Sequence, residues 1–408
     1  MQHRTILYFA ALLAIFSFAS TSTFAQVTLP TPGTDTSRIA DTTKKPSGYT
    51  LRTLHMSPVF TLPTEDNAGI DSAKQFDGGA RSLPDSFYYP GEKHLRNIRQ
   101  LTFEGENTET NFSSDGQYLC FEAQGIKRNK CDQIYRMSLS GNGVKRISQG
   151  YGATMRPCFL PSGDTILFAS THAEYGGGCP EPDSGHLYDW PLYGGYDLYL
   201  ADTNGTPSGR VTNNPNYYDA EASVSPKGDR IIFTSTRSGD IDLFSMKLDG
   251  TDVKQLTSEA GYDGYASYSP DGSKIVYCAS HPKGHSLTEY RELLKQGYFK
   301  PHTIEFYVMD ANGSHKRQVT HLDALSYSPS WTPDGKHIIF SSNYLDPKGA
   351  FNLFTIGGDG KDLEQITYGG GLNGFPQFSK DGKHLLFSSN RNHSHPSDTN
   401  IFVADWTE

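Results

Sequence analysis

The sequence predicts an all-β protein made of six copies of a four-strand unit, and three observations support this prediction. A Ser/Pro-Asp-Gly type of turn recurs six times along the 408 residues. An aromatic residue stands five positions after the glycine of each turn, and an apolar residue stands four positions before it. Short β-branched and aromatic runs bounded by Gly/Asp turns are typical of strands. Six such units closed into a ring make a six-bladed β-propeller.

The first two strands of each unit flank the repeated turn. The turn glycines are Gly116, Gly163, Gly228, Gly272, Gly335 and Gly382. The aromatic residues after them are Phe121, Phe168, Phe233, Tyr277, Phe340 and Phe387, and the residues before them are Phe112, Phe159, Val224, Tyr268, Trp331 and Phe378. Each turn therefore joins two predicted strands of one blade.

A third apolar run and a fourth, threonine-containing run complete each unit. The third runs contain Tyr135, Tyr199, Phe244, Tyr307, Phe354 and Phe402. The fourth runs, of the Gln-Leu-Thr type, follow only five of these, and the sixth copy is Gln100-Leu101-Thr102, ahead of the first complete unit. We therefore expect the N-terminal strand to close the ring by pairing near Ile401 to Ala404, because closure removes an exposed sheet edge.

The repeats resemble the TolB-like, WD-related β-propeller repeats of exported bacterial proteins. The best matches are Gln255-Leu256-Thr257, Ser269-Pro270-Asp271-Gly272 and Asp242-Leu243-Phe244-Ser245-Met246. The resemblance covers residues 95–408, which we take as the propeller domain. It implies a propeller fold, and such propellers serve as protein-binding platforms, as accessory domains of peptidases and occasionally as lyases.

The N-terminal segment predicts export. Arg4 is followed by an apolar run from Ile6 to Ala19 and by small residues before Gln26, a pattern typical of a secretory signal peptide over residues 1–25. The run is shorter than a membrane span needs. Residues 26–94, rich in Pro, Thr and Ser, predict an extended or disordered leader. We expect a periplasmic or secreted monomer without a transmembrane segment after signal removal.

Charge and composition limit the possible partners. The formal net charge is −9, and no long basic run is present, which argues against nucleic acid as a partner. The 12% aromatic and 20% charged residues are typical of a chain that buries a core. A protein, peptide or glycan is therefore the expected partner.

Two units carry long insertions that should lie on one face of the ring. The aromatic residues of the second and third strands are 31 and 30 residues apart in the second and fourth units, against 11 to 15 elsewhere. The insertions are residues 172–196, with Trp190 and Tyr193, and residues 280–303, where a helix is expected before Gly297. Structured insertions on a rigid scaffold commonly bind ligands, although they could also only shield a wide propeller mouth.

Two rings of side chains are expected near the channel mouth on the same face. Nine positions before the turn glycines stand Asn107, Thr154, Asp219, Asp263, Ser326 and Asn373, and seven positions before them stand Glu109, Arg156, Glu221, Tyr265, Ser328 and Phe375. Such oxygen-rich rings could hold a basic partner group or a hard cation such as calcium. Alternatively, the Asp, Asn, Ser and Thr residues only form the turn before the strand.

The sequence offers few catalytic motifs, so we expect a non-catalytic binding protein with no catalytic residues and no resident metal. No Gly-x-Ser-x-Gly motif occurs. Histidines of the two insertions (His172, His186, His281, His285 and His302) could converge on a metal only if the loops bring them together. The alternatives are a metal-dependent lyase or hydrolase in the channel mouth, and a structural envelope scaffold.

Five cysteines in an exported chain leave an odd number. Cys120 and Cys278 occupy apolar or small-residue positions and should be buried thiols. Cys131, Cys158 and Cys179 are expected near one face, with one disulfide among them: Cys131–Cys158 first, Cys158–Cys179 second.

Overall fold

The computed structural model describes residues 79–84, 87–124, 131–175, 178–180, 189–346, 349–369 and 371–408. The expected signal peptide, residues 1–25, lies outside the described residues, as does the leader up to residue 78.

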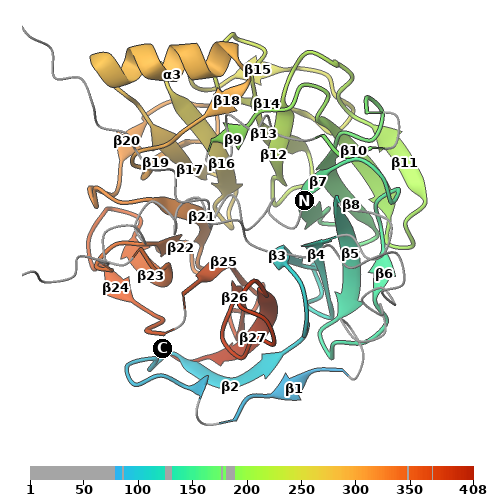
Figure 1. Ribbon diagram of the computed structural model, residues 1–408, viewed down its shortest axis with the longest axis vertical. Helices are drawn as coiled ribbons and strands as arrows, with labels where there is room; N and C mark the ends of the chain where they lie inside the picture. The colour runs from blue at the N-terminus through green and yellow to red at the C-terminus, as the bar shows by residue number, and fades with distance from the viewer. Residues whose placement is uncertain are drawn as a thin grey trace, which may run out of the picture.

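Six β-sheets surround a common centre, which confirms the six-bladed propeller (Figure 1). Five sheets have four strands and the sixth has five. The innermost strands are β3 (Asn107–Phe112), β7 (Thr154–Phe159), β12 (Asp219–Val224), β16 (Tyr262–Tyr268), β21 (Ser326–Trp331) and β25 (Asn373–Phe378). The second strands are β4 (Tyr118–Gln124), β8 (Thr165–Ser170), β13 (Arg230–Ser235), β17 (Lys274–Ser280), β22 (His337–Ser342) and β26 (His384–Ser389).

The outer half of each blade contains the third and fourth runs. The third strands are β5 (Asp132–Ser138), β10 (Asp197–Asp202), β14 (Asp242–Lys247), β19 (Glu305–Asp310), β23 (Asn352–Gly357) and β27 (Asn400–Trp406). The outer strands are β6 (Lys145–Arg146), β11 (Pro207–Arg210), β15 (Lys254–Gln255), β20 (Arg317–Gln318), β24 (Glu364–Gln365) and, for the last blade, β2 (Leu95–Gln100).

The repeated aromatic residues form one cross-strand pair in every blade. The pairs are Phe121–Tyr135, Phe168–Tyr199, Phe233–Phe244, Tyr277–Tyr307, Phe340–Phe354 and Phe387–Phe402, each directly opposite in register. Their ring centroids are 5.6 to 6.2 Å apart. Directly opposed aromatic side chains are among the stabilising pairs of a sheet. The spacing of these residues in the sequence therefore fixes the register of the second and third strands.

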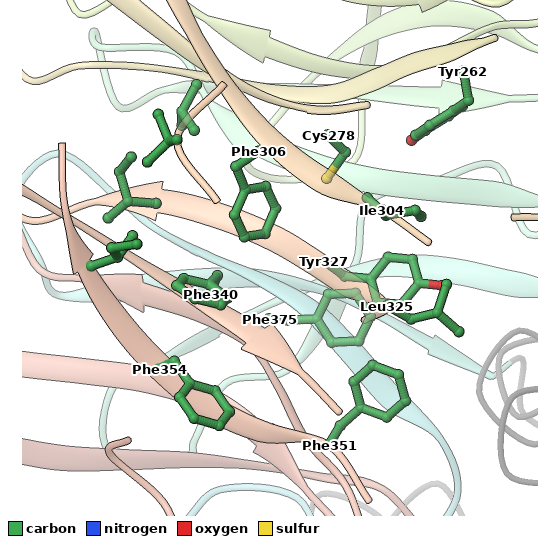
Figure 2. Packing of buried hydrophobic residues seen from close by; sticks show 14 of the residues in the cluster. Tyr262, Cys278, Ile304, Phe306, Leu325, Tyr327, Phe340, Phe351, Phe354 and Phe375 are labelled. Carbon is green, nitrogen blue, oxygen red and sulfur yellow. The ribbon is translucent and has the colours of Figure 1, made fainter. Parts of the chain in front are cut away.

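Alternate residues of a blade pack against different neighbouring blades. Ile338 and Phe340 of β22 join the core cluster shared with blade four, whereas Ile339 between them joins the cluster shared with the last blade. Phe340 meets Phe306 of blade four edge-to-face at 4.9 Å (Figure 2). Successive side chains of a strand point to opposite faces of the sheet. A blade packed between two other blades therefore has apolar residues on both faces of its strands.

The threonine of the fourth run ties the outer strand to the third strand. In blade three, Thr257 accepts a hydrogen bond from the Leu243 N–H (2.8 Å) and donates to Asp242 (3.2 Å). Thr102 does the same with Ile401 and Asn400 in the last blade. This bond supplies a partner for a buried backbone N–H, which explains the threonine of the Gln-Leu-Thr repeat.

The predicted closure by the N-terminal strand is confirmed. Strand β2 pairs antiparallel with β27, with Arg99 opposite Val403, and the Leu101 N–H donates to Ile401 O at 2.8 Å. Residues before Leu95 also take part, because β1 (Arg81–Ser82) pairs with β2 as a fifth strand (Figure 1). Part of the segment expected as a leader is therefore built into the last blade.

A buried ion pair holds this N-terminal segment. Both side chains of the pair are almost completely buried, Arg391 at 0% and Glu92 at 2% exposure. Two guanidinium nitrogens of Arg391 contact the two carboxylate oxygens of Glu92, at 2.9 and 3.2 Å, and one of them also donates to Asn373 at 3.1 Å. The ring is thus closed twice, by strand pairing and by a bidentate ion pair.

Candidate functional site

The two insertions meet each other over one end of the channel. Strand β9 (Trp190–Pro191) of the first insertion pairs antiparallel with β18 (Tyr298–Phe299) of the second. Helix α3 (His285–Lys295) precedes β18, and Gly297, at φ 78°, follows its end, as expected for an αL stop. We call the β9–β18 pair and α3 together the lid.

Aromatic contacts anchor the lid to the propeller. The Trp190 ring lies 5.3 Å from the Tyr327 ring and 6.2 Å from the Tyr262 ring, centroid to centroid. Tyr290, the buried residue of α3, shares its one hydroxyl proton between Gly261 O, at 2.9 Å, and the Asp240 carboxylate. The lid is therefore part of the packed structure, which gives the face beneath it a fixed shape.

A bulge in every inner strand turns one side chain toward the channel. The residues seven positions before the turn glycines are Glu109, Arg156, Glu221, Tyr265, Ser328 and Phe375, and all six have φ between 47° and 54°. The ladder with the second strand shifts register at each of them. Left-handed conformations are uncommon for residues other than glycine, and bulges commonly redirect a side chain. We call these six residues the channel ring.

Contacts among the channel ring divide the channel into two cavities. The Arg156 guanidinium carbon lies 3.7 Å from the centre of the Tyr265 ring, and its nitrogens donate to Glu221 O (2.8 Å) and Ala266 O (2.7 Å). The Arg156 backbone N–H donates to Glu109, and the Tyr265 backbone N–H donates to Glu221 at 2.9 Å. The cavity next to the lid is called the lid-side cavity, and the cavity on the side of the repeated turns is the turn-side cavity.

The lid-side cavity has about 820 Å³ of space, including space open to solvent. Its walls combine aromatic, apolar and acidic side chains from all six blades and from the insertion that carries β9: Glu109, Glu122, Met155, Trp190, Pro191, Leu192, Tyr218, Glu221, Tyr262, Tyr265, Tyr327, Ser328 and Phe375. Tyr327 and Phe375 also belong to one buried hydrophobic cluster (Figure 2), so the cavity is continuous with the core at this point. A largely apolar concavity with a few polar groups is the usual form of a ligand site.

Two carboxyl groups lie together in this cavity. Glu122, on β4, is 5% exposed and is hydrogen-bonded to Glu109 of the channel ring. Burial, followed by the charges of Glu109 and Asp132, raises the pKa of Glu122 well above its usual range. Glu109 also accepts a hydrogen bond from the Tyr265 hydroxyl at 3.4 Å. The raised pKa of Glu122 favours its protonated form, which can donate a hydrogen bond to Glu109.

The third acid of the cavity, Glu221, is surrounded by donors. Its carboxylate accepts hydrogen bonds from the hydroxyls of Thr234 (2.7 Å), Tyr262 (2.9 Å) and Tyr218 (3.2 Å), in addition to the Tyr265 N–H. Burial and the Glu221 charge raise the pKa of Tyr262, so its phenol keeps its proton and remains a donor. Glu221 thus positions the tyrosine walls.

The residues nine positions before the turn glycines do not line the lid-side cavity. Three of them form ion pairs or hydrogen bonds with residues of nearby loops. Asp219 pairs with Arg237 at 2.8 Å, and Asp263 pairs with His281 at 2.9 Å. Asn373 donates to Gly369 O at 2.7 Å. Asp219, Asp263 and Asn373 are expected around the axis from the sequence, but they are not among the residues that line either cavity of the channel.

The remaining candidate residues divide between the two cavities and the lid. Trp190 borders the lid-side cavity, and Arg156 borders the turn-side cavity. Tyr193 packs beside the core of blades two and three, with its ring 6.3 Å from Tyr175. Sequence reasoning missed Glu122, although the same position in the other repeats holds Ala169, Thr234, Cys278, Ser341 and Ser388. A single acid among small residues was the available signal.

The disulfide joins Cys131 to Cys179, with the Cα atoms 5.5 Å apart. Both expected pairings, which used Cys158, were wrong. Cys158 lies beyond the bulge of β7, on the turn side, whereas Cys131 precedes β5 on the lid side. Burial raises the pKa of Cys158 to about 12, as expected for an inert core thiol. The disulfide therefore ties blade one to the insertion that carries β9.

Replacing Cys179 should destabilise the protein without unfolding it. The bond closes a loop with a sequence separation of 48, so chain entropy predicts that Cys179→Ser lowers the free energy of unfolding by about 4 kcal/mol. Urea denaturation measures this, and a Cys131→Ser/Cys179→Ser double variant should match the single variant. Thiol counting in denatured, unreduced protein should find three reactive cysteines, and a count of five would contradict the bond.

The described histidines of the insertions do not form a group of three, although His281 and His302 border the same pocket beside α3. His281 bridges Asp263 and Glu259, and the His172 ring lies tilted against the Tyr199 ring, with the centroids 4.2 Å apart. His186 lies outside the described residues. Across residues 79–408, leaving out the gaps given above, no three His, Cys, Asp or Glu side chains are grouped so that they could hold a metal ion. In the same part of the chain no helix is long and apolar enough to cross a membrane.

Comparison with known proteins identifies relatives of the propeller. A family model described as the TolB beta propeller domain matches residues 190–293 and 282–405. The uncharacterized protein Atu1656 of Agrobacterium fabrum is 25% identical over 266 residues, 56% of this chain and 82% of that protein. A TolB homolog of Chlorobium chlorochromatii is 28% identical over 139 residues, 28% of this chain and 31% of that protein.

A solved structure has the same fold. The putative TolB from Agrobacterium tumefaciens matches with a TM-score of 0.50 and 20% identity, covering 75% of this chain and 92% of that chain. At this identity the likeness concerns the fold alone, so the chemistry of the site must be argued from its own residues.

Proposed function

The chain belongs to the TolB β-propeller family, and on this basis we propose that it is an exported, non-catalytic propeller that binds a protein or peptide partner in the lid-side cavity. The observation that carries the proposal is the cavity itself, which the two insertions cover by pairing with each other. A purely structural scaffold would need no such concavity. The partner's projecting segment would fill the cavity, and the lid would contact the residues on both sides of it.

The composition of the walls supports a binding role. Trp190, Tyr218, Tyr262 and Tyr327 present large rigid surfaces with few rotatable bonds, which is typical of residues that dominate binding energy. The hydrogen bonds to Glu221 hold the Tyr218 and Tyr262 rings in place before any ligand arrives. Preorganised walls reduce the entropy lost on binding.

Selection from a displayed random-peptide library tests the proposal, with the same protein applied to a glycan array. Peptides enriched on the wild type should bind Trp190→Ala about tenfold or more weakly, because the indole forms part of the cavity and of the lid. Tyr118→Ala, which changes an exposed tyrosine outside the cavity, is the matched control and should bind like the wild type.

Thermal unfolding of both variants shows whether the propeller itself is intact. Equal binding by wild type and Trp190→Ala would contradict the proposed site. Enrichment of glycans without any peptide would contradict a protein or peptide partner.

A further inference from the structure

We propose that the lid-side cavity receives one basic side chain, the ammonium of a lysine or the guanidinium of an arginine, and that its arrival displaces a proton from the Glu109–Glu122 pair. This inference rests on the proposed function, and it names the chemistry of the partner group. The argument depends on the charge of the cavity, on its aromatic walls and on the state of the carboxyl pair.

The cavity has an excess of acid. Its lining contains three glutamates, Glu109, Glu122 and Glu221, and no lysine, arginine or histidine among the described residues. The nearest basic residue of the channel ring, Arg156, borders the turn-side cavity instead, and its guanidinium donates to two backbone carbonyls. Buried carboxylates without a cation are costly, so a ligand that carries a positive charge would complement this cavity.

The walls suit an organic cation with an apolar stem. The Tyr262 and Trp190 rings border the cavity beside Tyr327, and cations are attracted to the faces of such rings. A lysine or arginine side chain buries its methylene groups against apolar surface and keeps only its head group polar. The Ser328 hydroxyl also borders the cavity, is buried, and lies beside the Tyr265 hydroxyl. It could accept a hydrogen bond from the ligand.

A bare calcium ion fits the same walls less well. Calcium takes six to eight oxygen ligands, whereas Glu221 already accepts four hydrogen bonds, three of them at one oxygen. That leaves the Glu109–Glu122 pair and Ser328 as the available oxygens, among mostly aromatic surface. Calcium, which the sequence leaves open as an alternative to a basic partner group, therefore becomes the competing outcome of the test.

The carboxyl pair explains the displaced proton. Glu122 faces Glu109 and Asp132 and lies near the Arg156 backbone N–H, while Glu221, Tyr262 and Tyr265 complete the titratable surroundings of the cavity. An ammonium between the two carboxyls stabilises the doubly ionised pair, so binding releases the shared proton. Binding that releases a proton is favoured when the proton concentration is low. The affinity should therefore increase from mildly acidic to neutral pH.

Calorimetric titration with three end-blocked tripeptides tests the inference: Ala-Lys-Ala, Ala-Arg-Ala and the uncharged Ala-norleucine-Ala. Buffers of different protonation enthalpy report the number of protons released. The lysine or arginine peptide should bind at least about tenfold more tightly than the norleucine peptide. In Glu122→Gln this preference should fall and proton release should disappear, whereas Asp359→Asn, at an exposed acid in the turn between β23 and β24 and outside the lid, should behave like the wild type.

The outcomes separate the inference from the proposed function. Charged and uncharged tripeptides could bind equally while binding of the library peptides still depends on Trp190. That result would contradict the preference for a basic side chain but not the proposed binding site. Calcium chloride that binds the wild type but not Glu122→Gln, without any lysine or arginine preference, would overturn it in favour of a metal. Loss of all peptide binding would overturn both.

Discussion

A chain that begins at Phe103, and so lacks β1 and β2, is expected to lose its soluble folded state. Strand β27 would then be the edge of the last blade, and unpaired strand edges promote aggregation. The deletion also removes Leu95, Ile98 and Leu101, which are at most 1% exposed, from two core clusters. Size-exclusion chromatography and sedimentation of the purified chain measure the result.

Two controls make this deletion informative. A chain that begins at Gly79 keeps every described contact of the N-terminal strands and should remain a folded species of the same size as the longer chain. Leu101→Asp places a carboxylate in the core of the last blade and should reproduce the aggregation, whereas Val253→Asp, at a residue 43% exposed, should not. A monodisperse chain starting at Phe103 would contradict closure as the source of solubility.

The repeat explains why so much of the fold could be predicted from the sequence. In every unit an aromatic residue follows the turn glycine at the same spacing in the sequence. This residue lies opposite an aromatic residue of the third strand in all six blades, which sets the strand register. The displaced sixth copy, Gln100-Leu101-Thr102, likewise predicts the N-terminal closure. These features occur in several copies, so each copy supports the others.

Features that occur once could not be predicted in the same way. The β9–β18 pairing joins two insertions that have no counterpart in the other blades. The Cys131–Cys179 bond depends on the path of one insertion, which the repeat does not determine. Two side-chain positions near the channel, nine and seven before each turn glycine, look equivalent in the sequence, but the bulge brings only the second into the channel.

Glu92→Ala is expected to lower the free energy of unfolding by about 3–5 kcal/mol, because it leaves Arg391 buried without its counter-ion. This loss would be a large fraction of a typical free energy of unfolding, which is about 5–15 kcal/mol. Urea denaturation measures it, and a shift of the midpoint without a change of slope would assign it to the folded state. Lys93→Met removes the neighbouring, exposed ion pair with Glu364 and should change stability little.

The double variant Glu92→Met/Arg391→Met distinguishes an unpaired charge from lost packing. Replacing a buried ion pair by apolar residues of similar volume is often nearly neutral, whereas removing one partner is costly. The double variant should therefore be more stable than Glu92→Ala, even though it changes two residues, and the double-mutant cycle with Glu92→Met and Arg391→Met should show strong coupling. Additive losses would contradict this account, since they would mean that each side chain acts through its own packing contacts.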